Sequence, residues 1–237
     1  MTPPVFWSAA LGDVGDTVLL DGAEGHHASA VRRLRPGERL DLADGAGEVA
    51  ECVVVEAGRD ALTCRVVRRR CVPAPQPRLV VVQALAKGGR DEDAVEAMTE
   101  VGVDAFVPWE AARSVARWKR DRWTSVAREA GKQSRRAWFP QVSPPASTAH
   151  VRELLAGAAL GVVLHEGAAE PLVSLLPPTT GDVVLVVGPE GGITDEELEA
   201  FSLAGAQTCR LGSTVLRTST AGVAAAAVLN ARSGRWA

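Results

Sequence analysis

Residues 183 to 201, VVLVVGPEGGITDEELEAF, place three glycines, a proline and a carboxylate directly after an apolar run. Such a run is typical of a buried strand, and open α/β sheets bind ligands in loops at the carboxyl ends of their strands. Thr194 followed three residues later by Glu197 is typical of a capping box, which predicts the start of a helix. Pro189 lacks an N–H donor and Glu190 adds negative charge, so the loop is poorly suited to a phosphate. The pattern predicts either a site for a neutral or cationic ligand or a tight turn.

A second loop of this kind precedes an alanine-rich helix near the end of the chain. In TCRLGSTVLRTSTAGVAAAAVLNA (208–231), a short strand and a loop lead to Arg217, and Thr218 or Ser219 can cap the helix that follows. A cation at a helix N-terminus is electrostatically unfavourable. Arg217 therefore has either a task outside the helix or a carboxylate partner.

A third loop follows the strand-like segment GVVLHE (161–166), which ends at His165 and Glu166. Polar residues after a strand are either ligand-binding groups or solvated loop residues. Three such loops at the ends of three strands favour a shared ligand site more strongly than any one of them does.

The charge of the chain is distributed unevenly. The net charge is −3, which by itself argues against a nucleic-acid-binding protein. Residues 113–136, however, contain nine arginine or lysine residues and two acidic residues. This basic segment predicts either an RNA-binding surface, with Trp118 or Trp138 stacking on bases, or a solvated helix face. The arginine triplet 68–70 is open to the same two interpretations.

The composition limits the class of protein. The chain has 237 residues, of which 46% are hydrophobic and 23% charged, and no apolar run reaches membrane-spanning length. Its first residues lack the basic start and long apolar stretch of a secretory signal. The four cysteines form no Cys-x-x-Cys pair, and the histidines do not stand at zinc spacing around them. We expect buried free thiols in a reducing cytoplasm, with no metal site.

The pattern of elements changes near residue 72. Before it, short strand-like segments at 17–20, 38–44, 48–56 and 61–67, with one short helix over 25–34, predict a small β domain, most simply a barrel. VPAPQPR (72–78) is typical of a stiff linker. After it, strands expected at 79–85, 103–109, 161–166, 182–188 and 208–211 alternate with helices expected at 91–102, 120–136, 150–158, after 192 and at 219–231. This alternation predicts a parallel sheet with helices on both faces.

The chain resembles the bacterial 16S ribosomal RNA uridine N3-methyltransferases, which are members of the SPOUT class. The motifs that carry the resemblance run in family order along nearly the whole chain. They are HHASAVRRLRPGERLDLADGAG (26–47), ALAKGGR (84–90), TEVGVDAFVPW with ARSV (99–115), RW…AREAGKQSRR…P (122–140), LHE (164–166), GPEGG with TDEE (188–197) and LGSTVLRTSTA (211–221).

The resemblance implies a fold, a cofactor and partners. The fold would be α/β, with a PUA-like β-barrel RNA-binding domain at 1–72, a Pro-rich linker at 73–78 and a SPOUT methyltransferase domain at 79–237 that has a parallel sheet and a C-terminal trefoil knot. The cofactor would be S-adenosyl-L-methionine. The partners would be 16S rRNA or the small ribosomal subunit and a second copy of the chain in a homodimer, with no membrane and no metal, in the cytoplasm.

The resemblance also implies roles for particular residues. Arg217 would stabilise the developing uracilate, Glu166 would act in catalysis, and the group that takes the N3 proton stays open among Glu166, His165, Glu190 and water. The cofactor would be bound by Leu164, His165, Glu166, Val187, Gly188, Pro189, Glu190, Gly191, Gly192, Leu211, Gly212, Val215, Leu216 and Arg217. The RNA would be bound by Arg32, Arg33, Arg113, Arg122, Lys132, Arg135 and Arg136.

The sequence departs from the family pattern in two places. Glu96 and Ala97 stand where members usually carry Gln-Lys, and Ser219 stands where members often carry a glutamate. The departures either remove an ion pair or bear on substrate handling. The alternative functions are another SPOUT reaction such as ribose 2′-O-methylation, a non-catalytic RNA-binding protein, and a nucleotide-binding oxidoreductase. The missing dinucleotide fingerprint speaks against the last of these.

Overall fold

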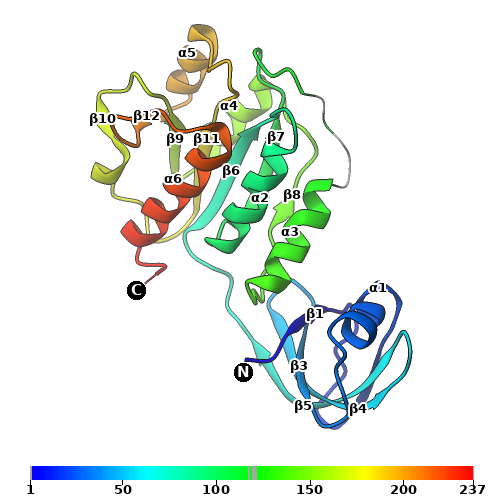
Figure 1. Ribbon diagram of the computed structural model, residues 1–237. Helices are drawn as coiled ribbons and strands as arrows, with labels where there is room; N and C mark the ends of the chain where they lie inside the picture. Colours follow the sequence, from blue (N-terminus) through cyan, green and yellow to red (C-terminus); the bar gives the residue numbers. More distant parts are fainter. Residues whose placement is uncertain (1, 117, 119–121, 237) are drawn as a thin grey trace. The chain divides into compact units, whose positions relative to one another are not determined.

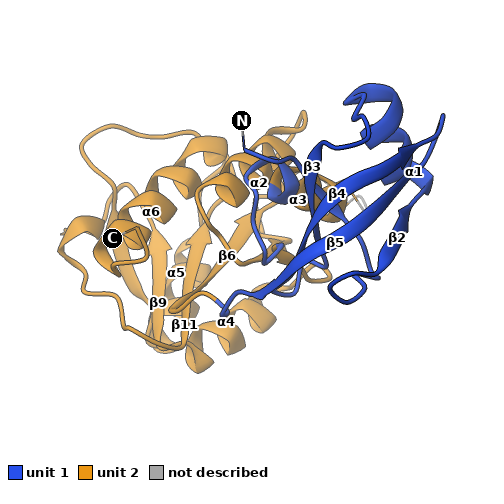
Figure 2. Ribbon diagram, turned by 90° about the horizontal axis from the view of Figure 1, so that it is seen from below, with its two compact units in different colours: residues 1–74, 131–139 blue, residues 75–130, 140–237 orange. Residues whose placement is uncertain are grey.

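The computed structural model of the protein describes residues 2–116, 118 and 122–236 (Figure 1). The chain divides into two compact units, coloured blue and orange in Figure 2. Unit 1 contains residues 1–74 and 131–139, and unit 2 contains residues 75–130 and 140–237. Among the described residues, no helix combines the length and the apolar character that a membrane crossing requires.

The described part of unit 2 is built on a seven-stranded sheet. Its order is β10-β12-β9-β11-β6-β7-β8, and every neighbouring pair is parallel. The strands are β6 (Arg78–Ala84), β7 (Ala105–Trp109), β8 (Gln141–Val142), β9 (Leu160–Leu164), β10 (Glu170–Pro171), β11 (Asp182–Val187) and β12 (Gln207–Arg210). The predicted parallel α/β sheet is therefore confirmed.

Helices cover both faces of this sheet, because successive side chains of a strand point to opposite faces. Leu79 and Val81 of β6 belong to one hydrophobic core, which α2, α3 and α6 complete. Val80 and Val82 belong to a second core on the other face, which α4 and α5 complete. The helices are α2 (Arg90–Glu100), α3 (Arg122–Gln133), α4 (Thr148–Gly157), α5 (Asp195–Leu203) and α6 (Thr218–Arg232).

The strand order creates a crevice at the carboxyl edge of the sheet. From β6 the chain continues to β7 on one side, whereas from β11, which pairs with β6, it continues to β12 on the other side. The loops that leave these neighbouring strands therefore diverge, which is the arrangement that opens ligand sites in α/β sheets. The parallel pairing also places the loops after β9, β11 and β12 at one edge.

Unit 1 is a curled five-stranded sheet in the order β1-β3-β4-β5-β2 (Figure 1). Among the described strand pairs of this sheet, only β1–β3 is parallel, and the others are antiparallel. Two register shifts between β4 and β5 mark bulges, which bend a strand and increase its twist. The elements are β1 (Val5–Trp7), β2 (Thr17–Leu20), β3 (Arg39–Ala43), β4 (Glu48–Ala57), β5 (Leu62–Cys71), helix α1 (Gly22–His26) and a π-helical turn, η1 (His27–Val31).

The strands and helices expected from periodicity are present, with ends that differ by a few residues, but several short elements were not anticipated. These are β1, β8, β10 and a 3₁₀ turn, η2 (Leu172–Ser174). Strands of two or three residues are too short to show an alternating pattern. The single helix expected over 25–34 is instead α1 followed by the π-helical turn, and it begins earlier, at Gly22.

All four cysteines are free, as expected, but only three of them are buried, and Cys71 is exposed. Burial raises the pKa of the Cys52 thiol to about 12 and that of Cys64 to about 11. Both thiols therefore stay protonated at neutral pH, and a protonated thiol is a poor nucleophile.

One segment of unit 1 comes from far along the chain. Trp138 donates a hydrogen bond from its indole nitrogen to the carbonyl of Val72 at 2.8 Å, and the backbone nitrogen of Phe139 donates to Gly45 at 2.9 Å. Gly47 has a φ of 105°, and a Cβ added to it would lie 2.7 Å from the Trp138 ring. The last glycine of the D-G-x-G motif has no Cβ and therefore leaves room for the ring of this tryptophan. The contacts favour a packing role for Trp138 over base stacking.

We predict that Gly47→Ala destabilises the protein more than Gly37→Ala does. Both glycines have a positive φ, which costs an alanine roughly 1–2 kcal/mol. Only at Gly47 does the new Cβ meet a ring, which adds about 1–3 kcal/mol of overpacking, whereas nothing lies within 4 Å of a Cβ at Gly37. Urea unfolding of the two variants measures the difference. Equal losses would mean that Trp138 does not lie against Gly47.

Candidate active site at the carboxyl edge of the parallel sheet

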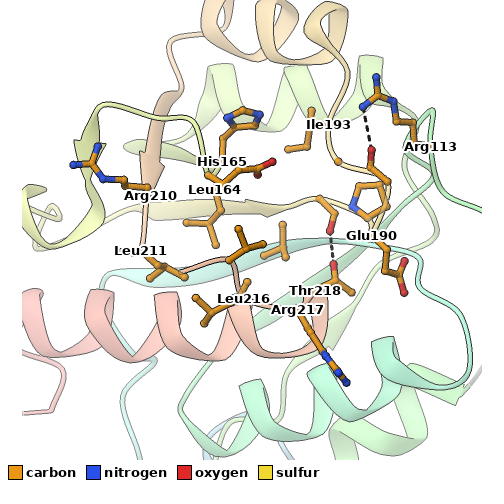
Figure 3. Close-up of a pocket in the computed structure, with 18 of the residues that line it drawn as sticks. Arg113, Leu164, His165, Glu190, Ile193, Arg210, Leu211, Leu216, Arg217 and Thr218 are labelled. Atoms are coloured by element: carbon orange, nitrogen blue, oxygen red, sulfur yellow. Dashed lines mark hydrogen bonds between the residues drawn. The ribbon is translucent and has the colours of Figure 1, made fainter. Parts of the chain in front are cut away.

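A pocket of about 730 Å³ lies where the loops after β9, β11 and β12 converge (Figure 3). The structure brings together every residue that the sequence assigned to cofactor binding. Leu164, His165, Glu166, Val187, Gly188, Pro189, Glu190, Gly191, Gly192, Leu211, Gly212, Val215, Leu216 and Arg217 all line this one pocket.

One side of the pocket is apolar. Leu164 is the last residue of β9, Leu211 and Leu216 lie in the loop after β12, and the three lie close to one another in Figure 3. Val187, the last residue of β11, is buried and contributes to the same lining. A surface of this kind suits the face of a planar aromatic group, because contact between the two removes apolar surface from water and leaves no hydrogen-bonding group unpaired.

The loop after β11 has few backbone donors to offer a phosphate. The N–H of Gly192 already donates to the carbonyl of Pro189 at 2.9 Å, and the N–H of Thr194 donates to the Glu197 carboxylate at 3.0 Å. The predicted capping box at Thr194 and Glu197 is therefore confirmed. Because Pro189 has no N–H, two further donors are used and Glu190 is acidic, the loop is poorly suited to a phosphate.

Two glycines allow the backbone of this loop to pack closely. A Cβ added to Gly188 would lie 2.7 Å from a side-chain carbon of Ile193, and Gly192 has a φ of 78°. Side chains at either position would push the loop open or strain it.

The first turn of α6 is tied directly to the same loop. The hydroxyl of Thr218 donates a hydrogen bond to the carbonyl of Gly188, drawn as a dashed line in Figure 3. The expectation that Thr218 or Ser219 caps α6 is wrong. Arg217 is the N-cap residue and makes no side-chain cap, while Thr218 lies inside the helix. The hydroxyl of Thr218 therefore joins α6 to the loop after β11 and does not cap its own helix.

The arginines that line the pocket come from the start of α2, the loop after β7, the end of β12 and the N-cap of α6. Arg113 donates to the carbonyl of Gly191 at 3.0 Å, and Arg90 forms an ion pair with Glu190 at 3.4 Å. Arg217 is exposed, and among the described residues its side chain has no hydrogen-bond or ion-pair partner. Its guanidinium is therefore available to a ligand.

The remaining titratable groups of the pocket leave the proton acceptor open. Glu166 is exposed and has no side-chain partner among the described residues. His165 accepts a hydrogen bond on Nδ1 from the N–H of Gly167 at 3.1 Å, which leaves its other ring nitrogen to face solvent or a ligand. Glu190 is paired with Arg90.

The residues that the sequence assigned to RNA binding occupy different settings. Arg32 and Arg33 are exposed after η1, and Arg135 is exposed with a φ of 59°. Arg136 is half-buried and has a partner. Arg122 pairs with Glu92 at 2.7 Å. Of the other basic residues in the segment, Arg117, Lys119 and Arg120 lie outside the described residues.

Lys132 does not present its charge to solvent. Its side chain is 7% exposed, and its ammonium contacts the carboxylate of Glu24 at 2.5 Å within unit 1. A buried ammonium needs such a partner, because an unpaired one would be costly to bury. Its setting thus favours a structural contact over the RNA contact that was expected.

The arginine triplet on β5 is matched by acids on neighbouring strands. Arg68 lies 3.6 Å from Glu51, and Arg69 lies 2.8 Å from Glu48. Arg70 lies 3.6 Å from Asp41 on β3. This cross-strand ladder neutralises the triplet, which favours the solvated-face interpretation over RNA binding.

Several pocket residues were not predicted as site residues. They include Arg90, Ile193, Asp195, Arg210 and Thr218. Arg90 belongs to the motif ALAKGGR, whose position after a strand could have placed it at the same edge. Ile193 and Arg210 carried no signal of their own. Arg210 donates to the carbonyls of Ala168 and Ala169, and so supports a loop.

Models of known families match both parts of the chain. The model described as an RNA methyltransferase domain matches residues 73–230, and the model described as an RNA methyltransferase PUA domain matches residues 20–67. The chain belongs to the RNA methyltransferase family. The PUA match agrees with the expected PUA-like fold of the N-terminal part.

Curated relatives of this RNA methyltransferase share one name, ribosomal RNA small subunit methyltransferase E. The protein of that name from Mycobacterium tuberculosis is 47% identical, over 100% of this chain and 94% of its own length. The one from Bacillus subtilis is 32% identical, over 86% of each chain.

Solved structures extend the similarity to the fold. A ribosomal RNA small subunit methyltransferase E from Neisseria gonorrhoeae, bound to S-adenosyl methionine, has a TM-score of 0.87 at 27% identity and is matched over 97% of this chain and 98% of its own. A putative methyltransferase from Legionella pneumophila, in complex with the cofactor SAM, has a TM-score of 0.85 at 26% identity, over 98% of both chains. The trefoil knot stays a prediction.

We predict that Thr218→Val lowers the free energy of unfolding by about 2 kcal/mol, because it leaves the Gly188 carbonyl without its donor. Thr218→Ser keeps the hydroxyl and loses one methyl group, so it should cost about 1 kcal/mol or less. Urea denaturation measures both variants. If the serine variant were as unstable as the valine variant, packing of the methyl group would explain the loss instead.

Proposed function

We propose that this RNA methyltransferase transfers a methyl group from S-adenosyl-L-methionine to N3 of a specific uridine in 16S rRNA of the small ribosomal subunit. The observation that carries the proposal is the pocket formed by three loops at the edge of the parallel sheet, with an apolar side and a loop after β11 that is poorly suited to a phosphate. The names of the relatives support the substrate, and the cofactor in the two solved structures supports the donor.

The pocket fits the proposed donor in size and chemistry. S-adenosylmethionine has no phosphate, and it combines an adenine with a sulfonium and an ammonium cation. Leu164, Leu211 and Leu216 would hold the adenine, while Gly191 and Gly192 would allow the backbone to approach closely. The carboxylates of Glu166 and Glu190 are compatible with the cations. When bound, the donor supplies an electrophilic methyl group.

The protein's own residues must orient the base and stabilise charge. Uracil N3–H is a weak acid, so negative charge develops on the ring and its oxygens as the proton leaves. The free guanidinium of Arg217 is suited to hold an O2 or O4 oxyanion. Glu166, His165, Glu190 and water stay the candidates for taking the proton. Because N3 lies on the Watson–Crick edge, the uridine must be unpaired and turned out of its stack.

We further propose that residues 1–72 form an RNA-binding domain, which the segment 131–139 completes, and that the rest of residues 79–237 forms the methyltransferase domain, with the linker at 73–78 between them. Arginines on both would follow the RNA backbone, through charge-assisted hydrogen bonds to phosphates. The proposed contacts are Arg32, Arg33, Arg113, Arg122, Arg135 and Arg136. The working form would be a homodimer in the cytoplasm, with α6 at its interface.

The proposal is tested by methyl transfer to small ribosomal subunits from cells that lack the gene, followed by mapping of the modified base. We expect one labelled uridine, methylated at N3, with both naked 16S rRNA and assembled subunits tested as substrates. Label on a ribose 2′-hydroxyl would replace the proposal with the other SPOUT reaction. An absence of transfer, together with no binding of S-adenosylmethionine in calorimetry, would leave a non-catalytic RNA-binding protein.

We predict that Arg217→Ala lowers the rate constant of methyl transfer about 100-fold, the usual cost of losing one oxyanion donor. The dissociation constant of S-adenosylmethionine should change by less than about 3-fold, because this side chain acts on the base. Arg217→Lys keeps the charge but loses the planar guanidinium, so its rate constant should lie between those of the parent protein and the alanine variant. Single-turnover kinetics and calorimetry separate the effects. Unchanged transfer in the alanine variant would remove Arg217 from the mechanism.

A further inference from the structure

Glu197 makes more contacts than a capping box requires. It lies in the first turn of α5, is 4% exposed, and accepts the N–H of Thr194 at 3.0 Å on one carboxylate oxygen. Its other oxygen accepts the N–H of Ala112 at 2.8 Å and the hydroxyl of Thr148 at 3.2 Å. A buried carboxylate with three donors from three segments connects those segments firmly, because each donor would otherwise lose its partner.

The hydroxyl of Thr148 extends this hydrogen-bond network to β7. Its hydroxyl accepts a hydrogen bond from the indole nitrogen of Trp109 at 3.2 Å and donates its own proton to Glu197. Trp109 is the last residue of β7 and is fully buried. The end of β7, the start of α4 and the start of α5 are thus held by one carboxylate.

The segment that Glu197 holds carries Arg113. Ala112 precedes Arg113 in the loop after β7, and Arg113 donates to the carbonyl of Gly191 at 3.0 Å. A Cβ added to Gly191 would lie 3.1 Å from the Cβ of Arg113, so the two loops are in close contact. Glu197 therefore fixes both sides of this contact, one through Thr194 and the other through Ala112.

We propose that Glu197 is a positioning residue for methyl transfer, which holds the loop after β7 so that Arg113 forms one wall of the pocket and meets the RNA there. Arg113 uses one terminal nitrogen on Gly191, and the remaining N–H groups of its guanidinium can bind a phosphate of the substrate. The inference rests on the proposed function, since it assigns the RNA to this side of the pocket.

The variant Glu197→Gln separates this role from ordinary capping. Glutamine serves as well as glutamate in capping boxes, where one side-chain oxygen is enough. With its single oxygen on the Thr194 N–H, the glutamine would point its NH₂ group at the Ala112 N–H, and two donors repel. The variant therefore keeps the hydrogen bond that caps α5 and loses the one that fixes the loop carrying Arg113. Glu199→Gln is the matched control, because Glu199 lies exposed on the same helix without a side-chain partner among the described residues.

The first measurement needs no RNA. Hydrogen exchange of the protein should show the amide of Ala112 exchanging at least about 10-fold faster in Glu197→Gln, as expected for the loss of a charge-assisted hydrogen bond. The amides of α5 should exchange as in the parent protein, and Glu199→Gln should change neither. Unchanged protection of Ala112 would overturn the proposal, whatever reaction the enzyme catalyses.

The second measurement is a double-mutant cycle with Arg113→Ala. Glu197→Gln should raise the KM for RNA about 10-fold and change the dissociation constant of S-adenosylmethionine less than about 3-fold. In the Arg113→Ala background, the same substitution should change the KM for RNA less than about 2-fold. Independent, multiplying effects of the two substitutions would show that Glu197 does not act through Arg113. If the parent protein methylated no uridine while Ala112 lost protection as expected, the proposed function alone would fail.

Discussion

The parallel pairing of β11 with both β9 and β6 is the constraint on which the site depends. Parallel strands end at one edge, so the loops after β9, β11 and β12 must meet there. The buried residues Val183–Val187 pack on helices on both faces, and this packing fixes the edge from which the loops leave. The turn of Gly188 and the bond from Thr218 then need to hold only a few residues of irregular backbone. The precision of the pocket comes from regular structure beneath it.

Hydrogen bonds within and between the loops limit which backbone groups the pocket offers to a ligand. Two of the donors that a phosphate would seek, the N–H groups of Gly192 and Thr194, are already used, on Pro189 and on Glu197. Beside these used donors, the pocket offers a ligand an apolar wall, several carboxylates and the guanidinium of Arg217. A cationic donor without a phosphate is compatible with these groups. Glu190, the acidic residue that the sequence left unexplained, is paired with Arg90 from the start of α2, 100 residues away in the chain.

The main strands, the start of α5 and most residues of the pocket could be predicted from the sequence, because short stretches of neighbouring residues determine them. Apolar runs of strand length gave β6, β9 and β11, and the Thr194–Glu197 spacing gave the start of α5. The fourteen residues that we expected to bind the cofactor lie in motifs that the strand topology brings to one pocket. Contacts between distant side chains gave no such signal. Nothing near Lys132 points to Glu24, and nothing in the arginine triplet shows that Glu51, Glu48 and Asp41 stand across the ladder. Short elements such as β8 fell below the length at which periodicity can be seen.

The segment 131–139 has a consequence for how the protein is made. Ala137 shares a small core with Ala43 and Val49, so unit 1 draws part of its interior from beyond the first half of unit 2. During synthesis, this core cannot close until residue 139 has left the ribosome, by which time more than fifty residues of the other unit have emerged. A fragment ending at the proline-rich linker would lack that cover, and would expose apolar surface where Trp138 and Phe139 belong. The two units are therefore interleaved in the order of synthesis, and neither can be cut out of the gene as one continuous piece.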